Sequence, residues 1–262
     1  MDLKKIFSVE KPIIGMIHFP PLIGYPDYPG IKKIEKRVLG EVEILNKGGV
    51  HSIMIENNYD IPHHEFVSPE ITAMMAKLAD LVVRNTNLPV GIDVLWNDFK
   101  SALGICAASG LSYFRVPAFV DSVRTVYGDM PARSKEVVSC RKKLGLENIA
   151  IFADVQVKHS EMVDPKKPLS LSVAQAFDSF AGAIIVTGKW TGDSPKVDDL
   201  KVARQTAGER PIIVGSGSTA ENLKTLFEYT DGIIVGTAIM TDGVVDEKKL
   251  KIYMDSYKRV FS

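Results

Sequence analysis

Eight short apolar runs recur along the chain, and longer segments with a helical pattern separate them. The runs are rich in Ile and Val and are continuous, with no regular alternation of apolar and polar residues. Continuous apolar strands are typical of a parallel sheet that is covered on both faces. The predicted strands span residues 13–17, 52–55, 89–95, 113–116, 150–155, 183–186, 211–214 and 232–235.

The intervals between these runs place apolar residues at helical spacing. Ser68 before Pro69 suits a helix N-cap followed by the first helical position. The runs begin about 20 or more residues apart, which leaves room for the crossover that parallel strands need. The predicted helices span residues 34–47, 69–85, 99–109, 133–144, 171–180, 197–206, 220–229 and 247–261.

Eight strand–helix units in 262 residues predict a closed (β/α)₈ TIM barrel that forms one domain over residues 1–262. An open doubly wound sheet is the alternative, and it fits eight regularly repeated units less well. The chain carries 32 Lys+Arg and 32 Asp+Glu, for a net charge of +0. This balance argues against broad nucleic-acid binding, which needs a basic surface.

The spacing of the cysteines and the lack of a predicted membrane-spanning segment both indicate where in the cell the protein is located. Cys106 and Cys140 lie far apart without metal-ligand spacing, so a reducing compartment is expected. Residues 12–25 are too short and too broken by proline to span a bilayer, which needs roughly 20 apolar residues. We therefore expect a cytoplasmic protein with no integral membrane segment.

Glycine-rich loops follow the last two predicted strands. In a barrel, the active site lies at the C-terminal ends of the strands, and the seventh and eighth loops often hold a phosphate. Glycines there let backbone N–H groups approach an anion closely. The alternative is that these glycines only make tight turns. The predicted phosphate ligands are Gly215, Ser216, Gly217, Gly236 and Thr237, with Gly188 from the sixth loop.

Two carboxylates interrupt apolar strands near their C-terminal ends, Asp93 and Asp154. A buried acid must be paired, hydrogen-bonded or neutralised. The pair can act as acid and base, or share a divalent cation through oxygen ligands. The alternative is a structural ion pair in the barrel mouth, with Arg115 or Lys158 as partner. Arg115 and Lys158 are themselves predicted to contact the ligand.

Other polar or aromatic residues follow strands and are candidates for the same site. Glu56 and His18 are predicted to join the two aspartates in acid–base chemistry, although His18 can equally be a packing residue. Asn57 and Asn58, which follow Glu56, can bind sugar hydroxyls or cap the backbone of their own loop. Lys158 can form a proton-transfer pair with His159, act as a Schiff-base amine if burial lowers its pKa, or be a solvated loop residue. Trp96 can stack on a sugar or base, or cover the barrel mouth.

No metal site is predicted from the sequence. His63, His64 and Glu65 are adjacent, but neighbouring histidines need not converge on one ion. No third ligand has the spacing of a known zinc motif.

Several sequence blocks together resemble the BtpA family: KPIIGMIHFPPLIGYP, GGVHSIMIENNYD, VTGKWTGDSP, PIIVGSGSTAENL and GIIVGTAIM. The resemblance runs from about residue 11 to residue 261. It implies a barrel like those that bind ribulose phosphate, with a small-molecule site. The family's namesake is associated with accumulation of photosystem I, and a bacterial relative encoded among sugar-metabolism genes carries the name of a nucleosidase.

Three functions remain open from the sequence. The leading hypothesis is an enzyme for a phosphorylated sugar or nucleotide-like metabolite, acting as an isomerase, lyase or glycosidic-bond hydrolase. The second is an assembly or regulatory factor that uses the barrel without turnover. The third is an FMN-binding barrel, because such barrels share the glycine loops. A homo-oligomer is the default expectation for its assembly.

Overall fold

Eight parallel strands close into a barrel in the computed structural model, which describes residues 3–261. Around the ring the order is β1, β11, β10, β9, β7, β4, β3 and β2, so the first strand pairs with the last. The closed ring confirms the predicted (β/α)₈ architecture. The barrel strands are β1 (Ile13–His18), β2 (Ser52–Glu56), β3 (Val90–Asp93), β4 (Tyr113–Val116), β7 (Ala150–Asp154), β9 (Ala183–Val186), β10 (Ile212–Val214) and β11 (Gly232–Val235).

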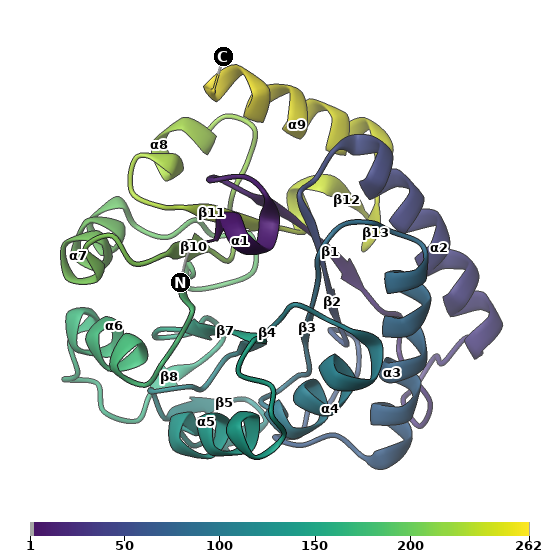
Figure 1. The fold of residues 1–262 in the computed structure, drawn as a ribbon, viewed down its shortest axis with the longest axis horizontal. Coiled ribbons are helices and arrows are strands. Elements are labelled where there is room, and N and C mark those ends of the chain that lie inside the picture. The colour runs from purple at the N-terminus through teal and green to yellow at the C-terminus, as the bar shows by residue number, and fades with distance from the viewer. Residues whose placement is uncertain (1–2, 262) are drawn as a thin grey trace.

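An outer ring of helices surrounds the strands (Figure 1). Each predicted helix overlaps an observed one, although α8 is much shorter than its predicted ten residues. The Asn222 amide donates to Gly217 O and its oxygen accepts from Thr219 N, which keeps this stretch in a loop. The helices are α2 (Ile31–Gly48), α3 (Pro69–Arg84), α4 (Phe99–Ser109), α5 (Ser134–Lys143), α6 (Leu169–Asp178), α7 (Val197–Ala207), α8 (Leu223–Phe227) and α9 (Glu247–Val260).

A short helix that the sequence pattern did not predict, α1 (Lys4–Phe7), crosses the centre of the ring in Figure 1. Four residues are too few to show a helical period. The Phe7 ring is buried and lies 5.5 Å from the Tyr113 ring and 6.2 Å from the Phe152 ring, between centroids. The segment before β1 therefore closes one end of the barrel with an aromatic side chain.

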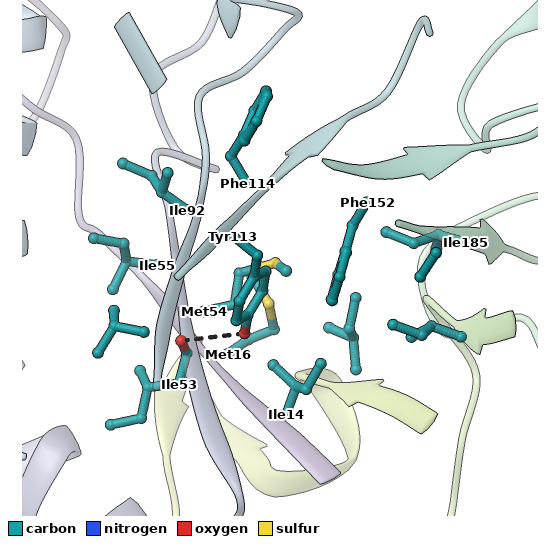
Figure 2. Close-up of a cluster of buried hydrophobic side chains, with 14 of the residues drawn as sticks. Ile14, Met16, Ile53, Met54, Ile55, Ile92, Tyr113, Phe114, Phe152 and Ile185 are labelled. Atoms are coloured by element: carbon teal, nitrogen blue, oxygen red, sulfur yellow. Dashed lines mark hydrogen bonds between the residues drawn. The ribbon is translucent and has the colours of Figure 1, made fainter. Parts of the chain in front are cut away.

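Large side chains fill the barrel interior (Figure 2). Tyr113 stacks on Phe152 at 4.5 Å, and its hydroxyl lies 2.7 Å from Ser52 Oγ. Gly91 makes room for this ring, because a Cβ at that position would lie 2.1 Å from Tyr113 Cε2. The interior is thus a packed core, and a ligand has access only at the strand ends.

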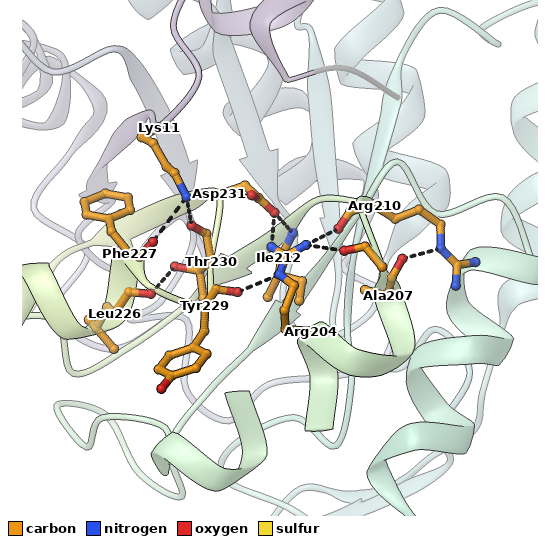
Figure 3. A network of polar contacts seen from close by, with 11 residues as sticks. Lys11, Arg204, Ala207, Arg210, Ile212, Leu226, Phe227, Tyr229, Thr230 and Asp231 are labelled. Carbon is orange, nitrogen blue, oxygen red and sulfur yellow. Dashed lines mark hydrogen bonds and ion pairs between the residues drawn. The ribbon is translucent and has the colours of Figure 1, made fainter. Parts of the chain in front are cut away.

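A polar network ties the starts of three barrel strands together at the N-terminal end (Figure 3). Lys11, just before β1, donates to Phe227 O at 3.2 Å and Thr230 O at 2.6 Å. Asp231, just before β11, accepts from Ile212 N at 2.9 Å and pairs with Arg204 of α7. These contacts fix the barrel end opposite the C-terminal ends of the strands, and residues at this end of (β/α)₈ barrels stabilise the fold.

Two small sheets and a 3₁₀ turn lie in the loops that follow the barrel strands. One sheet is built from β5 (Val123–Thr125), β6 (Gly128–Met130) and β8 (Glu161–Met162), which joins the loops after β4 and β7. After β11 come η1 (Thr237–Ile239) and the hairpin of β12 (Met240–Thr241) and β13 (Val244–Val245). None of these short pieces has enough length to produce a sequence period.

Candidate active site

A cavity of about 180 Å³ opens at the C-terminal ends of the barrel strands. A water molecule needs about 10–15 Å³ by the same kind of measure, so the cavity accepts a small metabolite. Both ends of the chain contribute to its wall. It is lined by Met16, His18, Glu56, Asn58, Arg115, Lys158, Thr191, Gly192, Gly215, Ser216, Gly217, Ser218, Thr219, Ile234, Gly236, Thr237 and Ala238.

Arg115, at the end of β4, lies among three carboxyl groups. Its Nε donates to Asp154 Oδ2 at 2.7 Å and its Nη2 donates to Asp154 Oδ1 at 2.9 Å, a bidentate pair. Its Nη1 lies 3.4 Å from Asp93 Oδ2 and 4.0 Å from Glu56 Oε2. The guanidinium thus occupies the space between the carboxylates that a shared divalent cation would need. Asp154 adopts the ion pair with Arg115 that the sequence analysis kept as its alternative role.

Asp93 is fully buried, and neither of its carboxyl oxygens has a hydrogen-bond partner among the described residues. Burial raises the pKa of Asp93 well above its usual range, against the opposing effect of Arg115. Burial also raises the pKa of Asp154, although Arg115 holds that carboxyl by two hydrogen bonds. For Arg115 itself, burial alone would lower the pKa, but Asp154, Asp93 and Glu56 together outweigh burial and raise the pKa. Neither aspartate lines the cavity; both lie beneath its floor.

His18 and Lys158 line the cavity from opposite parts of the ring. Burial lowers the pKa of His18, and the nearby Glu56 opposes that shift. Burial also lowers the pKa of Lys158, and Arg115 lowers it further. The two shifts favour neutral forms, which can accept a proton or attack a carbon atom.

The glycine loop after β10 presents free donors to the cavity. Among residues 3–261, the backbone N–H groups of Ser216, Gly217 and Ser218 donate to no other protein atom. Gly217 has φ +67°, and a Cβ there would lie 2.1 Å from Asp193 C, so this position requires glycine. Consecutive free N–H groups at a concave surface are suited to holding an anion.

The loop after β9 packs over this glycine loop. Gly188 N donates to Ser216 Oγ at 2.9 Å, and Ser216 Oγ donates to Asp193 O at 2.9 Å. A Cβ on Gly188 would lie 2.2 Å from Asp193 O. Gly188 therefore supports the loop without lining the cavity, whereas Thr191 and Gly192 of the same loop line it.

Like Gly188, the predicted ligand residues Asn57 and Trp96 lie outside the cavity lining. Asn57 Oδ1 accepts from Leu95 N at 2.8 Å, and its Nδ2 donates to Asp60 Oδ2 at 3.1 Å, so the amide joins two loops. Trp96 is buried in a small apolar cluster with Ala118, Val123, Met130 and Val157. Asn57 is fully buried and Trp96 is 6% exposed, so both side chains pack within the loops.

Several lining residues were not predicted as ligands, among them Thr191, Ser218 and Thr219. Each belongs to a loop that begins at a strand end, and that position was the available signal. Sequence alone did not show which side chain of a loop turns inward. Asn58 lines the cavity, for example, while its neighbour Asn57 turns away.

Neither a metal centre nor a membrane span emerges from the described part of the chain. Residues 3–261 contain no group of three or more His, Cys, Asp or Glu side chains placed to hold an ion. Within the same residues, every helix is too short or too polar to cross a bilayer.

The ring of strands and the polar cavity at its C-terminal mouth define a (β/α)₈ barrel whose strand-end loops form the wall of a cavity. The chain belongs to the BtpA family, which it matches over residues 9–259.

Individual relatives agree with this assignment. An uncharacterized protein of Thermococcus kodakarensis is 34% identical over 91% of this chain and 90% of its own length. The photosystem I biogenesis protein BtpA of Synechocystis is 31% identical over 94% of this chain and 86% of its own length. Among solved structures, thiamine phosphate pyrophosphorylase from Pyrococcus furiosus superimposes with a TM-score of 0.62 at 13% identity, covering 96% of this chain and 97% of its own.

Proposed function

We propose that the protein is an enzyme acting on a phosphorylated sugar or nucleotide-like metabolite, with the phosphate held by the loops after β10 and β11. The observation that carries the proposal is the row of free N–H groups at Ser216, Gly217 and Ser218 on the cavity wall. Gly236 and Thr237 line the same cavity from the last barrel loop. Charge-assisted hydrogen bonds from backbone N–H groups hold phosphates without any side-chain charge.

The groups opposite the glycine loops supply the chemistry. A neutral His18 can take a proton from the substrate, and Glu56 lies in the same cavity as a second proton carrier. The Arg115 guanidinium reaches the cavity floor and stabilises negative charge that develops on a substrate oxygen. This set serves an isomerase, a lyase or a hydrolase of a glycosidic bond. The Pyrococcus structural neighbour, a thiamine phosphate pyrophosphorylase, is consistent with a phosphorylated substrate.

Calorimetric titration with ribose 5-phosphate and with inorganic phosphate tests the anion site. Gly217→Ala should weaken both strongly, because the new Cβ would displace the loop backbone at Asp193. Gly104→Ala is the matched control, since its Cβ meets nothing within 4 Å in the exposed face of α4. Binding that is absent in the parent protein, or equal in both variants, contradicts the proposed phosphate position.

A second candidate function rests on the similarity to the Synechocystis photosystem I biogenesis protein. A non-catalytic assembly factor needs an exposed apolar surface away from the cavity. An apolar groove between α3 and α4, lined in part by Phe66, Val67 and Ile105, offers one. Under this function Asp154→Asn should leave the assembly phenotype intact, whereas the enzyme hypothesis expects that variant to lose activity.

An FMN-binding barrel remains the third candidate, because flavin phosphate can use the same glycine loops. The absorption spectrum of the purified protein tests it directly. A flavin absorption band in the visible region supports an FMN-binding barrel. A protein that binds no FMN after incubation with it contradicts this function.

A further inference from the structure

Lys158 is the one group in the cavity wall whose environment is not accounted for by phosphate binding or by the Arg115 ion pair. Its Nζ has a single polar contact among the described residues, with Thr191 Oγ1 at 3.4 Å. It makes no ion pair with any residue between 3 and 261, although it is largely enclosed by the site. A lysine that only stabilised the fold would be expected to pair with a carboxylate or to extend into solvent.

The backbone around Lys158 is shaped to hold it at the cavity. Gln156 and His159 have positive φ values of 49° and 59°, which non-glycine residues rarely adopt. Gln156 N donates to Asp121 Oδ2 at 2.8 Å, and Lys158 N donates to Thr187 Oγ1 at 3.0 Å. His159 Nε2 is 2.7 Å from Thr191 Oγ1. This loop is therefore fixed on both sides of the lysine, and residues in unfavourable conformations concentrate at functional sites.

The charges nearby indicate what kind of group Lys158 meets. Glu56, Asp93 and Asp154 all lie close enough to influence Lys158 electrostatically, and Arg115 also acts on it. A second anionic group of a substrate would approach these three carboxyls and be repelled. A neutral carbonyl carbon meets no such repulsion. Burial lowers the pKa of Lys158, and Arg115 lowers it further. The lower pKa increases the fraction of Lys158 that is a neutral amine, which is the nucleophilic form.

We propose that Lys158 is a covalent catalytic residue that forms an iminium with the carbonyl carbon of an open-chain phosphorylated aldose or ketose. The nitrogen lone pair forms the C–N bond while the C=O π electrons move to oxygen, which takes up a proton. A proton leaves the nitrogen, the resulting hydroxyl is protonated, and the C–O bond breaks to release water as the lone pair forms C=N. Glu56, on the same cavity wall, carries these protons. This inference rests on the proposed phosphate site, which orients the sugar.

Reductive trapping tests it on the intact protein. The probe is ribose 5-phosphate with cyanoborohydride, which delivers hydride to the iminium carbon and leaves a stable secondary amine. Peptide mass mapping locates the label. We expect it on Lys158, formed about tenfold or more faster than with unphosphorylated ribose, because one lost phosphate contact corresponds to roughly that factor. Excess inorganic phosphate should suppress it.

Variants and calorimetry separate the outcomes. Lys158→Arg should remove the label, and Lys166→Arg should keep it, because Lys166 is an exposed lysine of the same loop. The map of the parent protein decides the matter even if Lys158→Arg does not fold. If ribose 5-phosphate binds but the label spreads over surface lysines or avoids Lys158, the covalent role is overturned while the phosphate site stands. If neither ribose 5-phosphate nor phosphate binds, the proposed function itself fails.

Discussion

Replacement of Arg115 by methionine should destabilise the protein far more than the loss of an equally well-formed surface pair. Methionine keeps much of the side-chain volume but removes the guanidinium from among Asp154, Asp93 and Glu56. The two aspartates are fully buried and would then have no cation within contact distance. Removal of one partner from a buried ion pair costs about 3–5 kcal/mol of the free energy of unfolding. Asp154→Asn should cost less, about 1.5–3 kcal/mol for hydrogen bonds to a charged group, because Asp93 and Glu56 still neutralise Arg115.

The cost of Arg115→Met should depend on pH in a defined direction. Burial already raises the pKa of Asp93 and Asp154, and removal of Arg115 raises both further. A carboxyl whose folded pKa exceeds its unfolded value of about 3.9 binds more protons when folded, so stability falls as pH rises above that value. The variant should therefore be closest to the parent near pH 4 and furthest from it at neutral pH.

Urea unfolding followed by circular dichroism, repeated from pH 4 to pH 8, measures these free energies. Arg124→Met is the control, because Arg124 also makes a bidentate pair, with Asp129 at 2.7 and 3.1 Å, but on the surface. Exposed pairs contribute little, so this variant should unfold near the parent midpoint. An Arg115→Met variant as stable as Arg124→Met, or equally destabilised at every pH, would refute the reasoning.

Three further predictions follow from other parts of the structure. Phe7→Ala should lower the free energy of unfolding by about 3–5 kcal/mol, because it empties the buried end of the barrel, and a change below about 1 kcal/mol would show that α1 is not part of the core. The Asp93→Asn variant has no ionisable group at this position, so its urea midpoint should fall less steeply between pH 4 and pH 8 than the midpoint of the parent protein. Parallel plots of midpoint against pH would contradict a pKa of Asp93 that is raised by burial. Ser216→Ala removes the contacts to Gly188 N and Asp193 O, so amide exchange should accelerate across residues 188–194 and stay unchanged in α4.

Most of the barrel was predictable because its strands are apolar on both faces. Every predicted run overlaps a barrel strand, and the run at residues 89–95 is longer than β3, which ends at Asp93. Just beyond the end of β3, Leu95 N donates a hydrogen bond to the Asn57 side chain. This contact joins segments that are distant in the sequence, so no local sequence pattern predicts it. The small sheet of β5, β6 and β8 was not predicted either. Its strands are only two or three residues long, and they come from two loops that are distant in the sequence.

The candidate site was predictable at the level of loops but not of individual side chains. Position at or after a strand end drew attention to His18, Glu56, Arg115 and Lys158, and the structure places all four in the lining of one cavity. It did not distinguish Asn57 from Asn58, because a one-residue change in a loop reverses the direction of the side chain. The Arg115–Asp154 pair depends on the pairing of β4 with β7, and only the closed barrel fixes that neighbourhood.

The pairing of β1 with β11 has a consequence for how the protein is made. His18 and Met16 lie near the start of the chain, whereas the glycine loops of the cavity begin at Gly215 and Gly236. Contacts so distant in sequence form late, because a long stretch of chain must first be ordered. A nascent chain on the ribosome therefore holds His18 and Met16 long before either glycine loop exists, and the cavity should be completed in a single final step as the eighth barrel strand closes the ring.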